Sequence, residues 1–338
     1  MAISIPDRVE QPLLLVLLAD GLVHSGEWLA KELKVSRTAV WKGVQRLRAL
    51  GVAVEALPRR GYCLPHPVEL LDARRIEAQI DPERRAAIRR LELKFDVDST
   101  NTRLMSAAPP PPGSADACLC ELQHAGRGRR GRRWIAPFGA GLAMSVAWTF
   151  GDGARTLPAL SLAVGVAVSR ALARAGASGV ALKWPNDIWF RDRKIGGVLI
   201  ELRAEASGPA HVVIGVGINV TMAAAMRLEI ESGGVQAAAA ADACALPPSR
   251  NLLAGALLDE LLSMLGRFER EGFAAFRDDW TALDALRDRP ARVLLADSVI
   301  SGTARGVDSE GALLLDTGGQ VQRFVSGEAS LRAIEGAA

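Results

Sequence analysis

A series of short strands joined by tight turns, between Ala117 and Asn219, most constrains how this chain can fold. The segment LAMSVAWTF alternates with period two, and ACLCELQ, ALKW, DIWF, GVLIEL and HVVIGVGIN also have strand character. Turns as short as RDRKIG indicate hairpins between neighbouring strands. A helix is expected near Leu157 to Ala175, where apolar residues recur at helical spacing. The sequence therefore predicts an α+β fold with a largely antiparallel sheet and helices on one side.

The N-terminal part of the chain predicts a separate module of three helices followed by a β-hairpin. Ser25 and Ser36 are suited to cap the second and third helices, which are joined by the short turn KVS. In the third helix Val40, Val44 and Leu47 form one apolar face. The segment VAVEALPRRGYCLP then predicts two short strands around a basic turn. This order of elements is that of a winged helix-turn-helix.

The outer face of the third helix carries basic and amide side chains. Such faces are most often only solvated, but two features favour DNA binding. Exposing the large apolar ring of Trp41 to water would be unfavourable on a surface that binds nothing. In addition, Arg59 and Arg60 lie at the tip of the adjacent hairpin. We expect contacts to base edges and phosphates from eight residues: Ser36, Arg37, Thr38, Trp41, Lys42, Gln45, Arg59 and Arg60.

Two composition changes divide the rest of the chain. The segment LPHPVELL contains two prolines and predicts a hinge after the first module. From Arg289 onward, short strands separated by SGTARG, DSEG and TGGQ predict a small β-barrel. We therefore expect three domains, at residues 1–66, 67–287 and 288–338. The alanine-rich stretch from Ala237 to Ala245 is expected to be a mobile loop.

Overall charge and cysteine content set limits on location. The 41 basic and 38 acidic residues leave a formal charge of only +3, so any basic cluster is a local feature. The four cysteines form no CxxC pair and are too few for a disulfide scaffold. The apolar run PLLLVLLADGLV lacks a basic start, carries Asp20 and is too short to span a bilayer. We expect a cytoplasmic protein that does not enter a membrane.

The stretch QHAGRGRRGRRWIAPFG, from Gln123 to Gly139, contains five arginines and no acid. It matches GxGxxG, but no helix follows to hold a pyrophosphate, so a dinucleotide site is rejected. The chain has no GxxxxGK[ST] motif either. Glycines let backbone N–H groups approach an anion, and arginines are always-ionised donors for phosphate or carboxylate. The alternative is a basic loop that contacts RNA, for which only Trp134 and Phe138 offer stacking rings.

Further polar turns favour a pocket over a loop that contacts RNA. KWPND places Lys183, Asn186 and Asp187 around Pro185, which interrupts a strand ladder. DRKIGG places Lys194 in a hairpin turn, and GVGIN ends a strand in close-approach glycines. Together these turns would form a site for a nucleotide and an acidic small molecule. They would supply cations, a carboxylate for Mg²⁺ and exposed backbone N–H groups.

DSTN, QHAGRGRRGRRW, KWPND, DRKIGG and GVGIN, in this order behind a winged helix, resemble the family of bifunctional biotin–protein ligases and biotin operon repressors. FVSGEASLR near the end extends the resemblance over almost the whole chain. The resemblance implies a sheet related to class II aminoacyl-tRNA synthetases and an SH3-like C-terminal barrel. It also implies that biotin and ATP form biotinyl-5′-adenylate, and that biotin then passes to a lysine of a biotin carboxyl carrier protein domain. An adenylate-bound homodimer would bind operator DNA and repress biotin biosynthesis.

The resemblance also implies roles for individual residues. Lys194, Arg129, Lys183 and Asp187 would be catalytic, with Asp187 also a ligand of Mg²⁺. The biotin site would comprise Ser99, Thr100, Asn101, Gln123, Gly126, Arg127, Gly128, Arg129, Lys194, Gly197, Leu199, Gly215 and Gly217. The nucleotide site would comprise Arg130, Arg132, Trp134, Asn186 and Asn219.

Two further functions remain open at this point. A lipoate-type ligase shares the fold but is expected to lack the arginine loop and the winged helix. A ligand-sensing transcriptional regulator without ligase activity would not need Lys183, Asp187 and Lys194 together. The chain departs from the family between Val220 and Arg250, where alanines and SGGV replace a tryptophan-containing loop.

Overall fold

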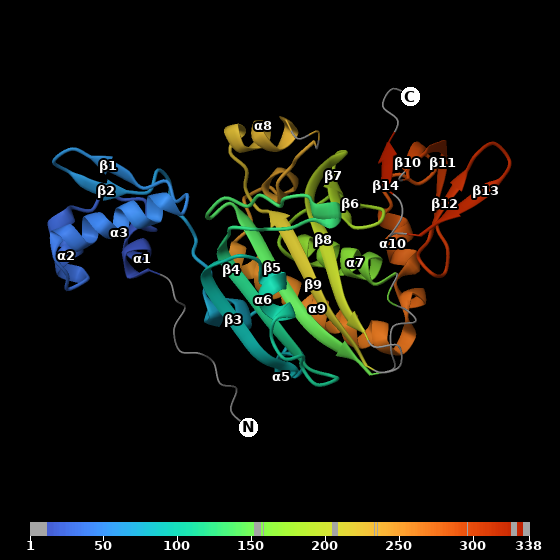
Figure 1. Ribbon diagram of the computed structural model, residues 1–338, viewed down its shortest axis with the longest axis horizontal. Coiled ribbons are helices and arrows are strands. Elements are labelled where there is room, and N and C mark those ends of the chain that lie inside the picture. Colours follow the sequence, from blue (N-terminus) through green and yellow to red (C-terminus); the bar gives the residue numbers. More distant parts are fainter. Residues whose placement is uncertain are drawn as a thin grey trace.

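Seven strands form the central sheet, in the order β3-β4-β5-β9-β8-β7-β6 (Figure 1). The computed structural model describes residues 12–151, 157, 159–204, 209–232, 234, 236–295, 297–325 and 330–333. The central strands are β3 Ile88–Val97, β4 Ala115–Gln123, β5 Gly141–Phe150, β6 Val180–Lys183, β7 Asp187–Phe190, β8 Arg193–Ala204 and β9 Ala210–Asn219. The strands predicted between Ala117 and Asn219 are therefore confirmed.

Most neighbours in this sheet pair antiparallel, as predicted. β7 and β8 form a hairpin whose two turn residues, Arg191 and Asp192, have φ values of 48° and 62°, as tight hairpin turns require. The exception is β3, which pairs parallel with β4. These two strands are linked through helix α6, Thr100–Met105, and a helical crossover lets consecutive strands run in the same direction. The sheet is therefore mixed rather than wholly antiparallel.

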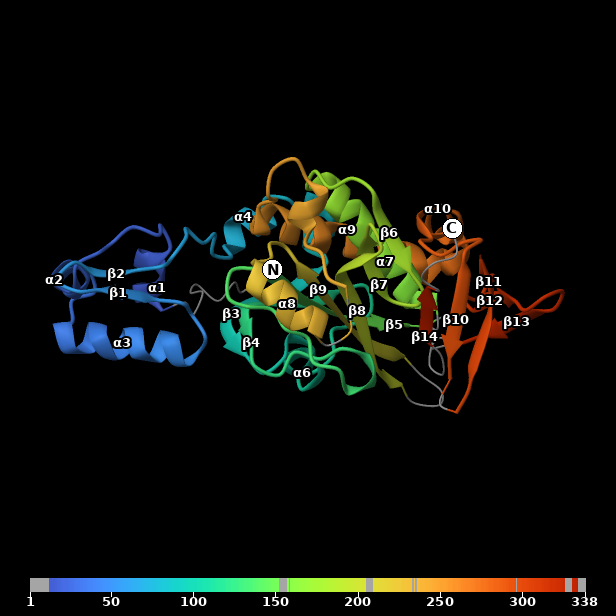
Figure 2. The same cartoon turned by 90° about the horizontal axis from the view of Figure 1, so that it is seen from above.

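Helices cover both faces of the sheet. The long helices α7 (Leu160–Arg174) and α9 (Arg250–Glu271) pack together on one face, and the short α6 lies on the other (Figure 2). Leu104 of α6 packs with Cys118, Ala147 and Val213. The prediction of helices on one side of the sheet is confirmed for the two long helices. It is wrong for α6, which lies on the other side. Its position brings the N-terminal turn of α6 to the face that carries the cavity described below.

The C-terminal unit is a five-stranded antiparallel sheet in the order β13-β12-β11-β10-β14. Its strands are β10 Pro290–Leu294, β11 Val299–Val307, β12 Leu313–Asp316, β13 Val321–Phe324 and β14 Ser330–Ala333. This confirms the small all-β unit predicted after Arg289. Its apolar residues join the core of the central domain, and the indole Nε1 of buried Trp184 donates to the Gly311 carbonyl at 3.1 Å. Helix α10, Arg277–Leu283, precedes it.

The N-terminal module has the predicted helix-helix-helix-hairpin order. Its elements are α1 Leu13–Leu18, α2 Gly26–Glu32, α3 Arg37–Ala49, β1 Glu55–Leu57 and β2 Gly61–Cys63. The hydroxyls of Ser25 and Ser36 accept from the backbone N–H groups of Trp28 and Ala39, which confirms both caps. Val40, Val44 and Leu47 are buried. The module lies at one end of the molecule, and the C-terminal sheet lies at the other (Figures 1 and 2).

The segment after this module is anchored rather than freely hinged. The Glu69 carboxylate accepts from the Ser249 hydroxyl at 2.7 Å and from the Arg250 backbone N–H at 2.6 Å, at the start of α9. The buried Arg250 guanidinium donates to the Glu69 carbonyl and to the Glu121 carboxylate, each at 2.8 Å. Two short helices follow, α4 Ala73–Glu77 and α5 Pro82–Ala86. In the described part of the chain, no helix is long and apolar enough to cross a bilayer.

The alanine-rich segment is packed, so the prediction of a mobile loop is wrong. Ala237 to Ala240 are at most 1% exposed. The segment hydrogen-bonds to β8: the Lys194 N–H donates to the Gln236 carbonyl at 2.8 Å, and the Ala238 N–H donates to the Lys194 carbonyl at 2.9 Å. Small methyl side chains permit this close approach. Helix α8, Ala224–Ser232, also lies between Val220 and Arg250, the region where the sequence departs from the family.

Candidate active site

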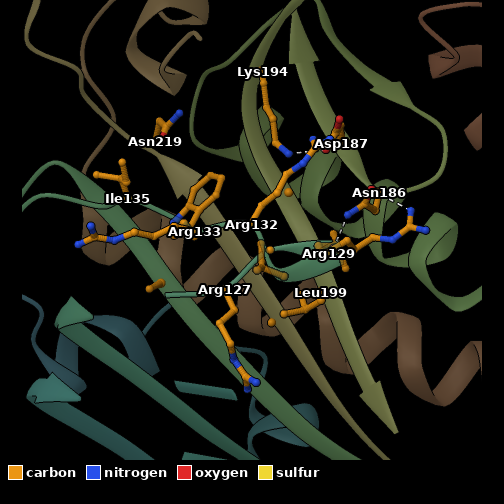
Figure 3. A pocket seen from close by; sticks show the side chains of 18 of the residues that line it. Arg127, Arg129, Arg132, Arg133, Ile135, Asn186, Asp187, Lys194, Leu199 and Asn219 are labelled. Carbon is orange, nitrogen blue, oxygen red and sulfur yellow. Dashed lines mark hydrogen bonds and ion pairs between the residues drawn. The ribbon is translucent and has the colours of Figure 1, made fainter. Parts of the chain in front are cut away.

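A cavity of about 370 Å³ lies over the glycine-rich end of β9, where several predicted turns converge (Figure 3). The arginine loop between β4 and β5, the turn between β6 and β7, and the start of β8 surround it. Nineteen of the twenty residues predicted for catalysis, biotin or nucleotide line it: Ser99, Thr100, Asn101, Gln123, Arg127, Gly128, Arg129, Arg130, Arg132, Trp134, Lys183, Asn186, Asp187, Lys194, Gly197, Leu199, Gly215, Gly217 and Asn219. The remaining residue, Gly126, is not part of the lining.

The arginine loop is folded back on itself. The Gly128 N–H donates to the Arg132 carbonyl at 2.7 Å, and the Trp134 N–H donates to the Gly126 carbonyl at 2.8 Å. Between them lies a short 3₁₀ turn, η1 Arg129–Gly131, in which Arg130 has a φ of 57°. A Cβ at Gly126 would lie 2.6 Å from the Trp134 carbonyl oxygen, so only glycine fits there. Gly126 therefore holds the loop closed from behind the cavity.

Arg129 brings a partly desolvated positive charge to the cavity. Burial lowers the pKa of its guanidinium, and neighbouring Arg130 and Arg132 lower it further, while Asp187 opposes them. The Arg129 Nη1 donates to the Asn186 side-chain oxygen at 3.4 Å, a contact visible in Figure 3. An anion placed here would relieve the mutual repulsion of the arginines.

Two lysines meet one carboxylate at the opposite wall. Lys194 Nζ lies 2.5 Å from one Asp187 oxygen and Lys183 Nζ lies 3.2 Å from the other. Lys183 is only 4% exposed, and burial lowers the pKa of its ammonium even though Asp187 acts to raise it. Burial acts to raise the pKa of Asp187, but Lys194 and Lys183 outweigh it and the pKa lies below its ordinary value. The Asp187 carboxylate is therefore held between the two lysine side chains.

This arrangement does not favour Asp187 as a direct Mg²⁺ ligand. Both of its oxygens already accept from ammonium groups, whereas protein-bound Mg²⁺ uses free carboxylate oxygens together with substrate phosphates and water. Across the described residues, no group of three or more His, Cys, Asp or Glu side chains is arranged to hold a metal. The geometry instead makes Asp187 the residue that orients the two lysines.

An aromatic platform lies beside these cations. A Cβ at Gly217 would lie 2.5 Å from the Trp134 ring, so the indole rests on the bare backbone of β9. Lys194 Nζ is 6.0 Å from the centroid of this ring. The side-chain amide of Asn219 is fixed by donating to the Ala238 carbonyl at 3.1 Å. A flat, partly apolar ligand group therefore has a stacking surface next to the charged wall.

The turn at the start of α6 supplies the uncharged end of the cavity. Ser99 caps the helix, and the side-chain oxygen of Gln123 accepts from the Thr100 N–H at 2.9 Å. Asn101 packs against β9, where a Cβ at Gly215 would lie 2.3 Å from its side-chain oxygen. The predicted motifs DSTN and GVGIN thus meet through a close approach that only glycine permits.

Some lining residues were missed by sequence reasoning. Leu331 and Arg332 reach the cavity from β14 in the C-terminal unit, and Glu229 and Ile230 reach it from α8. FVSGEASLR contains Leu331 and Arg332 and carries part of the family resemblance, and its residues 326–329 lie outside the described part of the chain. The position of α8 had no sequence signal. Arg133 and Ile135 also line the cavity, and only their place in the arginine loop pointed to them.

A second hollow lies in the N-terminal module, between α3 and the hairpin. It is lined by Arg37, Thr38 and Trp41 on one side and by Arg59 and Arg60 on the other. Trp41 is 52% exposed, as the sequence suggested. Lys42 is exposed on α3 outside this groove, Gln45 is half-buried, and Ser36 acts as the helix cap. Five of the eight residues predicted to contact DNA therefore line this groove, and Ser36, Lys42 and Gln45 do not.

Comparisons with known proteins agree with this architecture. Residues 8–63 match the description HTH domain, residues 93–219 match the biotin/lipoate A/B protein ligase family, and residues 288–332 match the biotin protein ligase C terminal domain. The bifunctional ligase/repressor BirA of Salmonella typhimurium is 41% identical over 96% of this chain and 98% of its own length. The protein of the same name from Escherichia coli is 40% identical over 95% of this chain and 97% of its own.

A comparison with solved structures gives the same result. The biotin protein ligase from Aquifex aeolicus in complex with biotin and ATP superposes with a TM-score of 0.61 at 26% identity. The match covers 72% of this chain and 99% of that one. By its motifs, its fold and its relatives, the chain belongs to the family of bifunctional biotin–protein ligases and repressors.

Proposed function

We propose that this chain activates biotin with ATP to biotinyl-5′-adenylate and transfers biotin to a lysine of a biotin carboxyl carrier protein domain. The observation that carries the proposal is the convergence of Arg129, Lys183 and Lys194 on one cavity beside an aromatic platform and bare glycine backbone. The family of the relatives and the Aquifex aeolicus complex with biotin and ATP support the choice of substrates.

The charges of the site suit the first step. A biotin carboxylate oxygen attacks the α-phosphorus of ATP, the bond to the bridging oxygen breaks and pyrophosphate leaves. Two anions must approach each other, so fixed cations at their meeting point lower the barrier. Lys194 suits that point as a compact point charge, and Arg129 suits clasping the phosphate. Lys183 adds charge from the buried wall.

The two substrates would occupy opposite ends of the cavity. The biotin end would be formed by Ser99, Thr100, Asn101 and Gln123 at α6, with glycines of β8 and β9 below. The nucleotide end would be formed by Trp134 and Asn219 with Arg130 and Arg132. Because Asp187 is engaged by both lysines, Mg²⁺ would be held by the triphosphate, whose charge it would partly neutralise.

The second step needs only positioning of the carrier. The amine of the carrier lysine attacks the acyl carbon of the adenylate, the acyl–oxygen bond breaks and AMP leaves, while the amine loses a proton. The adenylate is already activated, so no serine or cysteine nucleophile is required. An arginine loop closed over the intermediate would keep water away from it until the carrier arrives.

Biotin-dependent exchange of labelled pyrophosphate into ATP tests the ligase proposal, with lipoate as the competing acid. Exchange with biotin, followed by label transfer to a purified carrier domain, is the expected result. Exchange with lipoate alone would redirect the substrate assignment. Biotin binding without exchange would favour a ligand sensor that is not an enzyme.

Operator binding is the second part of the proposed function, supported by the winged helix and by the repressor relatives. Arg37 of α3 and Arg60 of the hairpin both line the groove of the N-terminal module. The double substitution Arg37→Ala, Arg60→Ala is expected to weaken operator binding and to lower the slope of log K against log salt by about two, because each arginine that contacts a phosphate contributes about one. Fluorescence anisotropy at several salt concentrations measures this, and unchanged affinity and slope would contradict it.

Ligand-promoted dimerisation would link the two activities. Ordering of the arginine loop over the adenylate would complete a surface for a second copy, and two wings would then match a two-fold operator. Sedimentation with and without biotin and ATP tests this link. The domain limits 1–66, 67–287 and 288–338, and the cytoplasmic location, remain predictions.

A further inference from the structure

Glu201 lies on β8 behind the cavity and does not line it, yet it contacts both the α6 turn and the arginine loop. Its carboxylate accepts from the Asn101 side-chain amide at 2.8 Å. It also accepts from Arg127 Nη2 at 3.1 and 3.2 Å to its two oxygens. Neither the motifs nor the resemblance pointed to this residue. Asn101 and Arg127 belong to the two segments that would enclose biotin, so Glu201 joins them.

The contact with Asn101 fixes the orientation of a buried amide. Asn101 is 3% exposed, and its side-chain oxygen accepts from the Ser145 hydroxyl at 2.6 Å. The Asn101 NH₂ group donates to the Glu201 carboxylate at 2.8 Å and to the Leu199 carbonyl at 3.3 Å, so both acceptors on β8 require this group to face them. The Asn101 oxygen must then face Ser145, whose hydroxyl lies 2.7 Å from that of Thr100 in the cavity wall. The Glu201 carboxylate makes the shorter of the two contacts that set the hydrogen-bond pattern of the wall.

The contact with Arg127 fixes the arginine loop. In Figure 3 the Arg127 side chain points away from Lys194 and Asp187. Its Nη2 also donates to the Thr102 hydroxyl at 3.0 Å, so it spans from the loop to α6 and β8. This leaves the backbone of Arg127, rather than its guanidinium, on the cavity side. Arg127 is 46% exposed, so this half of the network is the weaker one.

We infer that Glu201 is a positioning residue for adenylate formation: it holds the Asn101 amide and the arginine loop in the geometry that binds biotin and retains the adenylate. This inference rests on the proposed ligase function. The two contacts of Glu201 should have different effects. The contact with Asn101 lies at the wall expected to bind biotin, and the contact with Arg127 holds the arginine loop.

The test is Glu201→Gln, which keeps the volume of the side chain and removes its charge. In Glu201, Oε2 accepts from both Asn101 and Arg127, and Oε1 accepts from Arg127 as well. A glutamine oxygen at the Oε2 position would accept without a negative charge, and the NH₂ group at the Oε1 position would face the Arg127 donor. The KM for biotin in pyrophosphate exchange is expected to rise about tenfold or more, with the KM for ATP changed less than threefold, because hydrogen bonds to charged groups are the stronger class. Arg203→Gln, an exposed charge removal on the same strand, is the matched control and should leave both values unchanged.

A second variant, Arg127→Met, leaves the carboxylate in place and tests the loop arm. Faster release of preformed biotinyl-adenylate is expected. In the double variant Glu201→Gln, Arg127→Met, the effect on the free-energy barrier to release should not exceed the sum of the two single effects, because the two residues share one contact. If Glu201→Gln fails to fold, as judged by its melting temperature, Arg127→Met alone carries the test. Wild-type kinetics from a well-folded Glu201→Gln, or unchanged adenylate release from Arg127→Met, would overturn the inference. A wild-type protein without any exchange would instead overturn the proposed function.

Discussion

Lys194→Ala is expected to lower the rate of biotin-dependent pyrophosphate exchange by about 10²–10³-fold, the usual cost of removing one preorganised donor from a developing anion. Lys194 Nζ is held by Asp187 at one side and lies 3.1 Å from where a Cβ on Gly197 would be. In the proposed function, this is the point where the biotin carboxylate and the α-phosphate would meet. The negative charge that Lys194 would stabilise develops only as the two reactants approach each other. The substitution should therefore lower mainly kcat, measured at saturating biotin and ATP.

Two further substitutions separate this role from a general loss of positive charge. Lys194→Arg keeps the charge but replaces a compact ammonium by a planar guanidinium, so it should recover less than a tenth of the lost rate. Lys31→Ala removes an exposed lysine from α2, remote from the cavity, and should leave the exchange rate unchanged. A raised KM with an unchanged kcat in Lys194→Ala would show that the lysine only binds substrate and would contradict a role in the transition state.

The sequence predicted the elements of the site better than their connections. The strands and turns came from short-range patterns, such as period-two alternation and the hairpin that carries Lys194. Such patterns are reliable only over a short range, because a turn determines the pairing of the two strands that it joins and of no others. The parallel pairing of β3 with β4 escaped this reasoning because it depends on α6 acting as a crossover. The packing of Ala237 to Ala240 also escaped it, since alanine has little preference of its own and burial was decided by β8.

Residues behind the cavity were the harder part. Glu201 lies in no motif, and no local pattern singled out Leu331 or Arg332 within FVSGEASLR. Glu201 contacts the walls of the cavity, and Leu331 and Arg332 line it, because distant strands pair in one particular register. Register is set by the whole buried face of a strand, not by local sequence. The KWPND motif pointed to Asp187, but its contacts with the two lysines depend on the pairing of strands, because the β6–β7 register places it directly opposite Lys183.

Asp187→Asn is expected to destabilise the fold by about 3 kcal/mol as well as to inactivate the enzyme. The substitution leaves Lys183 as a buried ammonium, 4% exposed, without a negative partner. Breaking a buried pair by removing one member is far more costly than removing both. Urea unfolding at pH 7 measures the loss. Asp192→Asn, which removes an exposed carboxylate paired with Arg289 at the tip of the same hairpin, is the matched control and should cost less than about 1 kcal/mol.

The pH dependence of this variant identifies the cause. Burial already lowers the pKa of Lys183, and removing Asp187 takes away the main influence that raises it. As pH rises towards the ordinary lysine value, the folded variant loses the Lys183 proton while the unfolded chain keeps it. The unfolded state then binds more protons, so the free energy of unfolding rises with pH. Asp187→Asn should therefore recover part of its stability relative to wild type between pH 7 and about 10, and a loss that does not change with pH would contradict the buried charge as its source.

A double variant separates stability from catalysis. Lys183→Met combined with Asp187→Asn replaces the buried ion pair by a nearly neutral, similarly sized pair, so it should be more stable at pH 7 than Asp187→Asn alone. It should nevertheless show little pyrophosphate exchange, because Lys194 has lost the carboxylate that orients it and the wall has lost a cation. Stability without activity would show that the cluster serves catalysis beyond neutralising one buried charge. Recovery of activity together with stability would instead mean that the carboxylate served only to neutralise Lys183, and that Lys194 finds its position without help.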